Sequence, residues 1–199
     1  IEVTDFASLQ TALRNRMDYF AKIGGCVSDH ALEYIMYAPA APEEIDTIFQ
    51  KALHGDVVTR GEETKFKMAF MQFVAGEYHK RNWVMQIHYG CKRDNNKAMY
   101  AKLGPDTGYD CINNYAPSAQ TADFLNALES ADSLPKTVLY SLNPHDNETI
   151  ASIIGCFQGT EAMGKIQHGS AWWFNDHKTG IISQMTSLAN LGLLSNFIG

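Results

Sequence analysis

The sequence lacks any apolar run near the roughly 20 residues that a membrane-spanning helix needs, and it lacks an excess of basic residues. Its 16 lysines and arginines stand against 22 aspartates and glutamates, which gives a formal net charge of -6. Nucleic acids and anionic membrane surfaces favour basic partners. We therefore expect no membrane segment and no nucleic-acid partner.

Two kinds of short motif are also missing. No glycine pattern of the dinucleotide-binding or phosphate-loop type occurs, which weakens a nucleotide-binding doubly wound fold. The four cysteines form no CxxC pair, and a chain of 199 residues with ordinary apolar content can bury a core without disulfides. We expect reduced thiols in a cytoplasmic protein.

What the sequence does contain is an alternation of short apolar strands and amphipathic helices. Polar sequence follows the carboxyl end of each strand, which is typical of repeated βα units around a parallel sheet. Strands are expected at residues 26–30, 83–90, 135–142 and 164–169, with the start of another at 197–199, and helices at residues 6–23, 31–37, 42–53, 60–81, 99–103, 117–131, 144–157 and 178–191.

Two of these helices carry a predicted buried stripe that the structure can test. In the helix at 60–81 the stripe is Phe66, Ala69, Phe70, Phe73 and Val74. In the helix at 178–191 it is Ile181, Ile182, Met185 and Leu188. Residues at these spacings share one side of a helix.

The number of βα units leads to a prediction about the whole fold. A closed barrel of eight units needs about 250 residues, whereas this chain holds about four units and the start of another strand. An open half-barrel would leave unpaired strand edges. We predict an α/β fold that is a partial TIM (β/α)8 barrel from a longer protein, with the helix at 42–53 as an insertion on its rim.

The strand at 83–90 is the most informative segment. Odd-numbered residues from Trp83 to Tyr89 form an apolar face, while Gln86 and His88 lie on the other. A histidine at the carboxyl end of a strand, followed by Gly90, lies where parallel α/β enzymes place their chemistry. From the strand alone a hydrogen-bonded core histidine is the favoured interpretation, and a functional histidine the alternative.

A series of short motifs runs along the whole chain. They include Val27-Ser28-Asp29-His30, His88-Tyr89-Gly90, Leu134-Pro135-Lys136-Thr137, Leu142-Asn143-Pro144 and, most specific, the tract GSAWWFND at 169–176. Together and in this order they resemble the uronate isomerases (glucuronate isomerases), (β/α)8 barrel enzymes related to the metal-dependent amidohydrolases.

The resemblance implies an intramolecular oxidoreductase of the aldose–ketose type. Its substrates would be hexuronate sugar acids: D-glucuronate interconverted with D-fructuronate, and D-galacturonate with D-tagaturonate. It also implies a cytoplasmic protein that is a homo-oligomer when complete. Residues 1–199 would be the C-terminal half of one metal-dependent hydrolase-like barrel, without its last strand and helix, and inactive on their own.

The resemblance also implies a metal. In the family a divalent cation, usually zinc, is held by an HxH pair on the first strand, a histidine on the fifth strand and an aspartate on the eighth. His88 matches the fifth-strand histidine, and the other ligands would lie outside this sequence. This chain alone should therefore bind the metal weakly or not at all, because one histidine cannot hold zinc.

Asp29 and Arg93 each have two interpretations. Asp29 is a candidate catalytic carboxylate, because isomerisation needs an acid or base near the carbons that exchange a proton. It could instead cap the helix expected at 31–37. Arg93 could bind the substrate carboxylate through its planar guanidinium or order its own loop.

The two adjacent tryptophans, Trp172 and Trp173, are candidate sugar-binding residues. An indole N–H can donate to a sugar hydroxyl and its face can stack on the ring. We expect one to face the site and the other the core, and the sequence does not decide which. For His30 and His168 we expect roles in the core or on the rim.

Two other functions compete with the isomerase. The first is a metal-dependent hydrolase of the same barrel family, which would act on lactones or amides. The second is a carbohydrate-binding fragment without catalysis, whose affinity for a sugar acid would survive removal of metal.

Overall fold

The computed structural model describes residues 1–115 and 117–197. The helices are α1 (Phe6–Lys22), α2 (Pro42–Leu53), α3 (Arg60–Lys80), α4 (Lys97–Leu103), α5 (Ser118–Ser130), α6 (Asn147–Gly155) and α7 (Lys178–Leu191), with 3-10 turns η1 (Pro144–Asp146), η2 (Trp173–Asn175) and η3 (Leu194–Asn196). The strands are β1 (Val27–Ala31), β2 (Val84–Tyr89), β3 (Cys91–Lys92), β4 (Cys111–Ile112), β5 (Lys136–Ser141) and β6 (Ile166–His168). No helix in this described part is long and apolar enough to span a bilayer.

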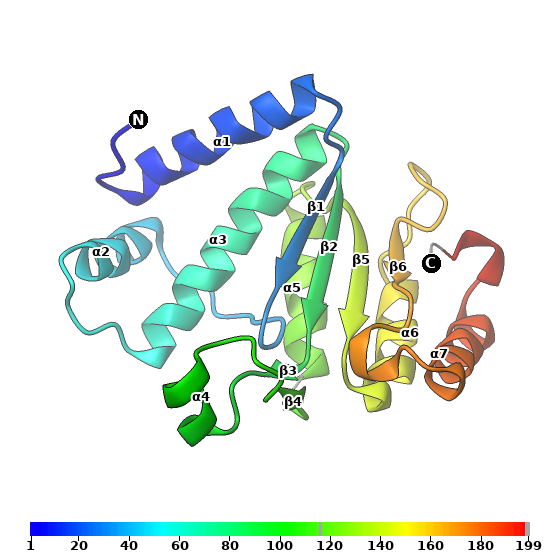
Figure 1. The fold of residues 1–199 in the computed structure, drawn as a ribbon. Coiled ribbons are helices and arrows are strands. Elements are labelled where there is room, and N and C mark those ends of the chain that lie inside the picture. Colours follow the sequence, from blue (N-terminus) through cyan, green and yellow to red (C-terminus); the bar gives the residue numbers. More distant parts are fainter. Residues whose placement is uncertain (116, 198–199) are drawn as a thin grey trace. The chain divides into compact units, whose positions relative to one another are not determined.

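Four strands form one sheet in the order β1-β2-β5-β6. Strands β5 and β6 pair in parallel, with Thr137 opposite Ile166 and Leu139 opposite His168. The arrows of β1, β2 and β5 point in one direction (Figure 1). The predicted α/β fold with a parallel sheet is therefore confirmed, as are two successive helices, α2 and α3, between β1 and β2.

The described chain divides into two compact units. The first holds Ile1–Ser28, Met36–Val84 and Asp123–Pro135, and the second holds the other described residues. Every residue singled out above as a candidate for the site belongs to the second unit. That residues 1–199 form part of one barrel domain remains a prediction.

In the first unit, α3 is covered on more than one side. The ring of Phe66 lies 5.4 Å from that of Phe6 on α1 and 6.0 Å from that of Phe49 on α2, and the guanidinium of Arg14 lies 4.9 Å from the ring of Phe73. Within the stripe predicted for α3, only Val74 is buried. The other predicted residues, Phe66, Ala69, Phe70 and Phe73, are half-buried, so the prediction of their burial is wrong. The fully buried residues are Met68, Met71, Val74, Ala75, Glu77 and Tyr78.

Glu77 is a buried carboxylate on α3, with a side chain that is 5% exposed. It accepts hydrogen bonds from Arg14 at 3.2 Å, Lys80 at 2.8 Å and Arg81 at 2.7 Å. Burial alone would raise the pKa of Glu77, but the hydrogen bonds from these three cations outweigh it and lower the pKa to about 2. Glu77 is consequently ionised at neutral pH and ties α1 to the end of α3.

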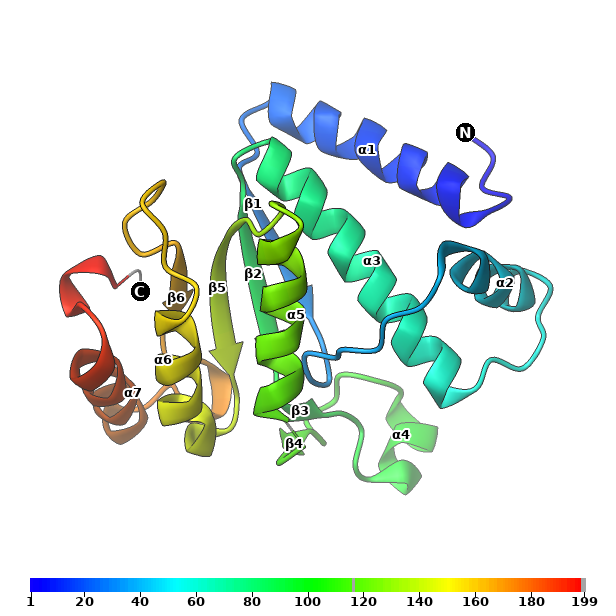
Figure 2. The ribbon, with the colours of Figure 1, turned by 180° about the vertical axis from the view of Figure 1, so that it is seen from behind.

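In the second unit, β2 shows the alternation that its sequence predicts. Met85, Ile87 and Tyr89 are buried, whereas Gln86 and His88 are half-buried. Further along the sheet α6 packs on β6, and α7 packs on α6 (Figure 2). Because the strands are parallel and end at one edge, His88 is held at a rigid strand end rather than on a loop.

Three sequence predictions about local structure need correction or completion. No helix forms at 31–37, where the chain bends at residues 33 and 34 and buries three consecutive side chains, Tyr34, Ile35 and Met36. Between the predicted helices at 99–103 and 117–131, where no strand was expected, β4 forms and pairs antiparallel with β3. The strand predicted at 197–199 lies largely outside the described residues, since 198 and 199 are not among them.

The buried face of α7 also differs from the prediction. Of the predicted stripe, Leu188 is buried as expected, but Ile181 and Ile182 are exposed, and the polar residues Gln184 and Ser187 are buried instead. Polar contacts explain the difference: the Gln184 side chain donates to the Gly169 carbonyl. The Ser187 hydroxyl donates to Glu148 on α6 at 2.7 Å.

Candidate active site

Asp29 on β1 and His88 on β2 meet at the end of the sheet. The His88 Nδ1 and the Asp29 Oδ1 are 2.7 Å apart. A carboxylate only accepts hydrogen bonds, so Nδ1 carries a proton, and in this tautomer Nε2 is the atom that can act as a ligand. The His88 side chain is 15% exposed and that of Asp29 is 63% exposed, which leaves the carboxylate open to a second partner. Because no helix follows β1, the alternative role of Asp29 as a helix cap is wrong.

Two aromatic rings contact the imidazole of His88. The ring of Tyr140 on β5 is stacked on it, with centroids 4.1 Å apart and planes 9° apart. The indole of Trp172 meets it edge-on at 4.4 Å and 70°. Burial, and to a lesser degree the charge of Asp29, raises the pKa of Tyr140. Sequence reasoning missed Tyr140, although its position near the end of the strand at 135–142 was a usable signal.

A pocket of about 300 Å³ opens beside His88, at the small end of the range for ligand sites. It presents two cations, Lys92 and Arg93, where an acidic ligand would find partners. Lys92 and Glu33 were not predicted as site residues. The lining consists of Ala31, Leu32, Glu33, His88, Tyr89, Cys91, Lys92, Arg93 and Trp172.

Arg93 orders the loop that follows β3. Its Nη1 donates to Asp110 Oδ2 at 2.9 Å and contacts Asp106 Oδ1 at 3.4 Å. The same Asp110 side chain accepts from the backbone N–H of Asp94 at 2.7 Å and is only 6% exposed. The loop-ordering interpretation of Arg93 is therefore seen directly, and contact with a substrate carboxylate remains a prediction.

Both tryptophans lie near the pocket beside His88. Trp172 lines the pocket against His88, and the ring of Trp173 has the Arg93 guanidinium 5.4 Å from its centroid. Trp173 is 39% exposed and stacks on Phe174 at 4.7 Å. The expectation that one tryptophan faces the core is wrong, because Trp173 has a φ of 48°, so the two side chains do not alternate as they would in a strand.

The two remaining candidate histidines have different surroundings. Burial lowers the pKa of the half-buried His30. His168 on β6 is fully buried, and its Nδ1 has no hydrogen-bond partner among residues 1–115 and 117–197. Burial lowers the pKa of His168 to about 4, although the charge of Glu148 opposes this. His168 is thus a neutral core residue.

Neutral His168 should make the protein sensitive to acid. The unfolded chain takes up a proton near pH 6.5 while the folded state resists protonation until about pH 4, so stability falls as pH drops through this window. The loss amounts to about 3 kcal/mol. Urea unfolding of His168→Gln should show a smaller loss between pH 7 and pH 4. His54→Gln, at an exposed position, should keep the wild-type pH profile; equal profiles for all three proteins would contradict the prediction.

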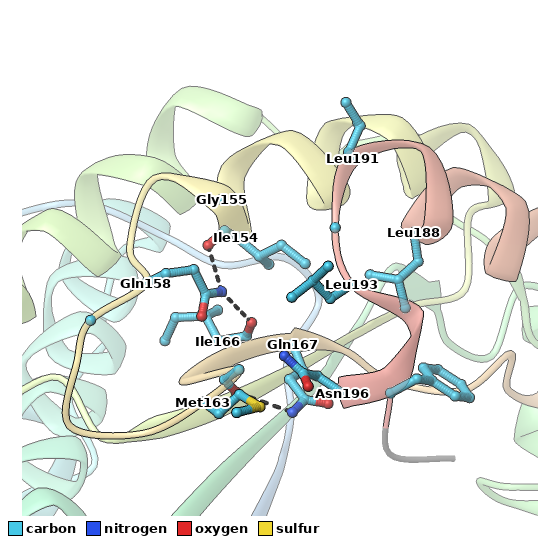
Figure 3. Close-up of a pocket in the computed structure, with 14 residues that line it drawn as sticks. Ile154, Gly155, Gln158, Met163, Ile166, Gln167, Leu188, Leu191, Leu193 and Asn196 are labelled. Atoms are coloured by element: carbon cyan, nitrogen blue, oxygen red, sulfur yellow. Dashed lines mark hydrogen bonds between the residues drawn. The ribbon is translucent and has the colours of Figure 1, made fainter.

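A second pocket, of about 320 Å³, lies among α6, β6 and α7 (Figure 3). Its walls are mainly apolar and none of its lining residues is ionisable. Gln158 Nε2 donates to the carbonyls of Ile154 and Ile166, and Gln167 Nε2 donates to that of Gly164, whereas the buried Gln167 Oε1 has no hydrogen-bond partner among the described residues. It offers no acid, base or metal ligand and is not a candidate for catalysis.

His88, where a metal was predicted, fits the role of one metal ligand. The imidazole suits one ligand position, because Asp29 holds Nδ1 and leaves Nε2 available. Within the described part of the chain, no three residues of the types His, Cys, Asp and Glu are grouped to hold a metal. His88 thus fits as one ligand, and the described residues do not form a complete site.

The chain is similar to proteins of one known family. A model of the family described as glucuronate isomerase matches residues 1–199. The chain is 63% identical to a uronate isomerase from Lachnospira eligens and 47% identical to one from Bacillus licheniformis, in both cases over its full length and over 42% of the relative. It therefore spans less than half the length of these curated relatives.

Solved structures agree with the sequence comparison. The uronate isomerase from Thermotoga maritima superposes with a TM-score of 0.87 at 29% identity, over 97% of this chain and 41% of that one. The glucuronate isomerase from Caulobacter crescentus gives 0.84 at 23% identity, over 98% of this chain and 39% of that one, and so supports the fold alone. The fold of the chain is that of a partial (β/α)8 barrel.

Proposed function

Because the chain belongs to the glucuronate isomerase family, we propose that the complete protein is a uronate isomerase. It interconverts D-glucuronate with D-fructuronate and D-galacturonate with D-tagaturonate. The observation that carries the proposal for this chain is the Asp29–His88 pair at a strand end, beside a pocket that presents Lys92 and Arg93. A sugar acid needs both kinds of group: cations for its carboxylate and an acid–base residue for its carbon chain.

His88 is proposed to hold a divalent cation, zinc being the proposed metal, through Nε2, together with ligands elsewhere in the complete protein. When bound, such a cation polarises a carbonyl or hydroxyl oxygen of the sugar. The hydrogen bond from Nδ1 to Asp29 supports this role, because a carboxylate behind a ligating histidine fixes its tautomer and raises its basicity.

Asp29 is proposed to move the proton. The aldose becomes a ketose when a proton leaves C2, another reaches C1, and the O2 hydroxyl proton is transferred to O1. Asp29 is exposed enough to accept a proton from the sugar while Oδ1 remains bonded to His88. A cytoplasmic location and a homo-oligomeric state complete the proposal and rest on the family resemblance.

Binding of the hexuronate is proposed to use the rest of the pocket wall. Arg93 faces the substrate carboxylate while its contact with Asp110 keeps the loop ordered. Trp172 donates through its indole N–H or packs against the sugar ring, and Trp173 borders the same region through Arg93.

We expect the complete protein, and not residues 1–199 alone, to turn over D-glucuronate. One histidine ligand is insufficient for tight metal binding, so the 199-residue chain should show no turnover above background. A coupled assay for D-fructuronate checks both proteins, with metal content measured in parallel. Turnover by the 199 residues alone would contradict the metal assignment, and absence of turnover by the metal-loaded complete protein would contradict the proposed function.

The same assay separates the competing functions. A hydrolase of this barrel type would act on lactones or amides in preference to hexuronates. A carbohydrate-binding protein would bind hexuronate by calorimetry with no product, and chelation would leave its affinity unchanged. Isomerase activity that disappears on chelation and returns with metal supports the proposal.

A further inference from the structure

The imidazole of His88 is held on its face as well as at its edge. Asp29 holds the edge through Nδ1 at 2.7 Å. Tyr140 covers a face with nearly parallel rings, 4.1 Å between centroids and 9° between planes. These restraints come from neighbouring strands, β1 and β5, on either side of β2.

The two restraints are complementary. A single hydrogen bond at Nδ1 fixes the distance to one atom but allows the ring to tilt about the axis between Nδ1 and Asp29 Oδ1. A flat ring stacked on the imidazole restricts that tilt, because tilting would separate the two faces or force them into contact. Together with the edge-on contact of Trp172 at 4.4 Å, they determine the direction in which Nε2 points.

The ring of Tyr140 is itself held by backbone. A Cβ built on Gly169 would lie 2.0 Å from Cε1 and 2.3 Å from Cζ of Tyr140, so only glycine leaves room for this ring. Gly169 cannot easily retreat. Its N–H donates to the Leu139 carbonyl at 2.9 Å, and its carbonyl accepts from the Gln184 side chain. The backbone of Gly169 thus forms a wall behind Tyr140.

We propose that Tyr140, supported by Gly169, is a positioning residue that sets the plane of His88 and thereby aims Nε2. This inference rests on the proposed role of His88 as a metal ligand. The aromatic ring of Tyr140, and not its hydroxyl group, performs this role. The pair Tyr140–Gly169 therefore acts on the reaction only through His88.

The test uses the complete protein and four variants: Tyr140→Leu, Tyr140→Phe, Gly169→Ala and His88→Asn. Zn²⁺ affinity is measured by competition with a chelator, and the His88 nitrogen shifts by NMR of 15N-histidine-labelled protein. Tyr140→Leu removes the flat ring at similar bulk and should weaken Zn²⁺ binding about 10- to 100-fold, the usual cost of losing support behind a ligand. Tyr140→Phe keeps the ring and should restore wild-type affinity.

Gly169→Ala provides an independent test if Tyr140→Leu fails to fold. Its methyl group displaces the Tyr140 ring, so Zn²⁺ affinity should fall and the His88 nitrogen shifts should change although Tyr140 is intact. Wild-type affinity and shifts in both Tyr140→Leu and Gly169→Ala would overturn the inference. If His88→Asn also keeps wild-type Zn²⁺ affinity, the proposed role of His88 fails instead, so the two failures are distinguishable.

Discussion

Replacing Asp29 with asparagine in the complete protein is expected to lower kcat for D-glucuronate by about 10²- to 10⁴-fold, the usual contribution of a positioned acid–base group. Asparagine retains a carbonyl oxygen that can accept from His88 Nδ1, so the 2.7 Å contact should survive. What it loses is the ability to take up a proton. Steady-state kinetics should therefore show a large fall in kcat with a small change in KM.

Metal content distinguishes two roles for Asp29. If Asp29→Asn loses activity but keeps wild-type Zn²⁺ affinity, the carboxylate acts on the substrate proton. If Zn²⁺ affinity falls together with activity, Asp29 acts mainly by orienting His88. The matched control is Asp123→Asn, an exposed carboxylate on α5, which should change neither quantity. Wild-type kcat in Asp29→Asn would refute a catalytic role.

Replacing Glu77 with glutamine is expected to cost about 3 kcal/mol of unfolding free energy, at the lower end for breaking a buried ion pair. The side chain is 5% exposed and accepts from Arg14, Lys80 and Arg81. Glutamine has one acceptor oxygen in place of two and no charge, so Arg81, itself 16% exposed, loses its buried counterion. The urea midpoint of the complete protein at pH 7 measures the change.

The pH dependence of this difference has a definite sign. Folded Glu77 stays ionised down to about pH 2, whereas the unfolded chain protonates this residue near pH 4.5. Its contribution is therefore fully present above pH 4.5 and is lost as pH falls toward 2. The gap between wild type and Glu77→Gln should narrow over that interval.

The matched control is Glu63→Gln, which breaks the exposed pair with Lys67 on the same helix. The Glu63 side chain is 52% exposed, so this change should cost less than 1 kcal/mol. If Glu63→Gln and Glu77→Gln were equally destabilising, burial of Glu77 would not be the cause.

Elements with strong local signals could be predicted from the sequence. Helix α2 begins at Pro42, α3 follows the Thr59–Glu62 capping box, and β2 keeps its period-two alternation. These features depend on neighbours within a few residues, so they can be recognised in the sequence alone. Prediction was poorest where contacts distant in sequence decide: the segment at 31–37 is not helical, because Tyr34, Ile35 and Met36 are all buried, which one face of a helix would not allow.

The same distinction between local and distant contacts applies to the site. The residue types of the site and their places after the strands, including Asp29, His88, Arg93 and Trp172, could be predicted from the sequence, and the order of motifs identified the family. Which of these side chains contact one another depends on the three-dimensional fold. Asp29 lies 59 residues before His88 and Tyr140 lies on another strand, so their contacts arise from strand pairing and from the missing side chain at Gly169. A single sequence contains no repeating pattern that indicates such contacts, because strand pairing in the sheet brings the partners together and their neighbours in the chain do not.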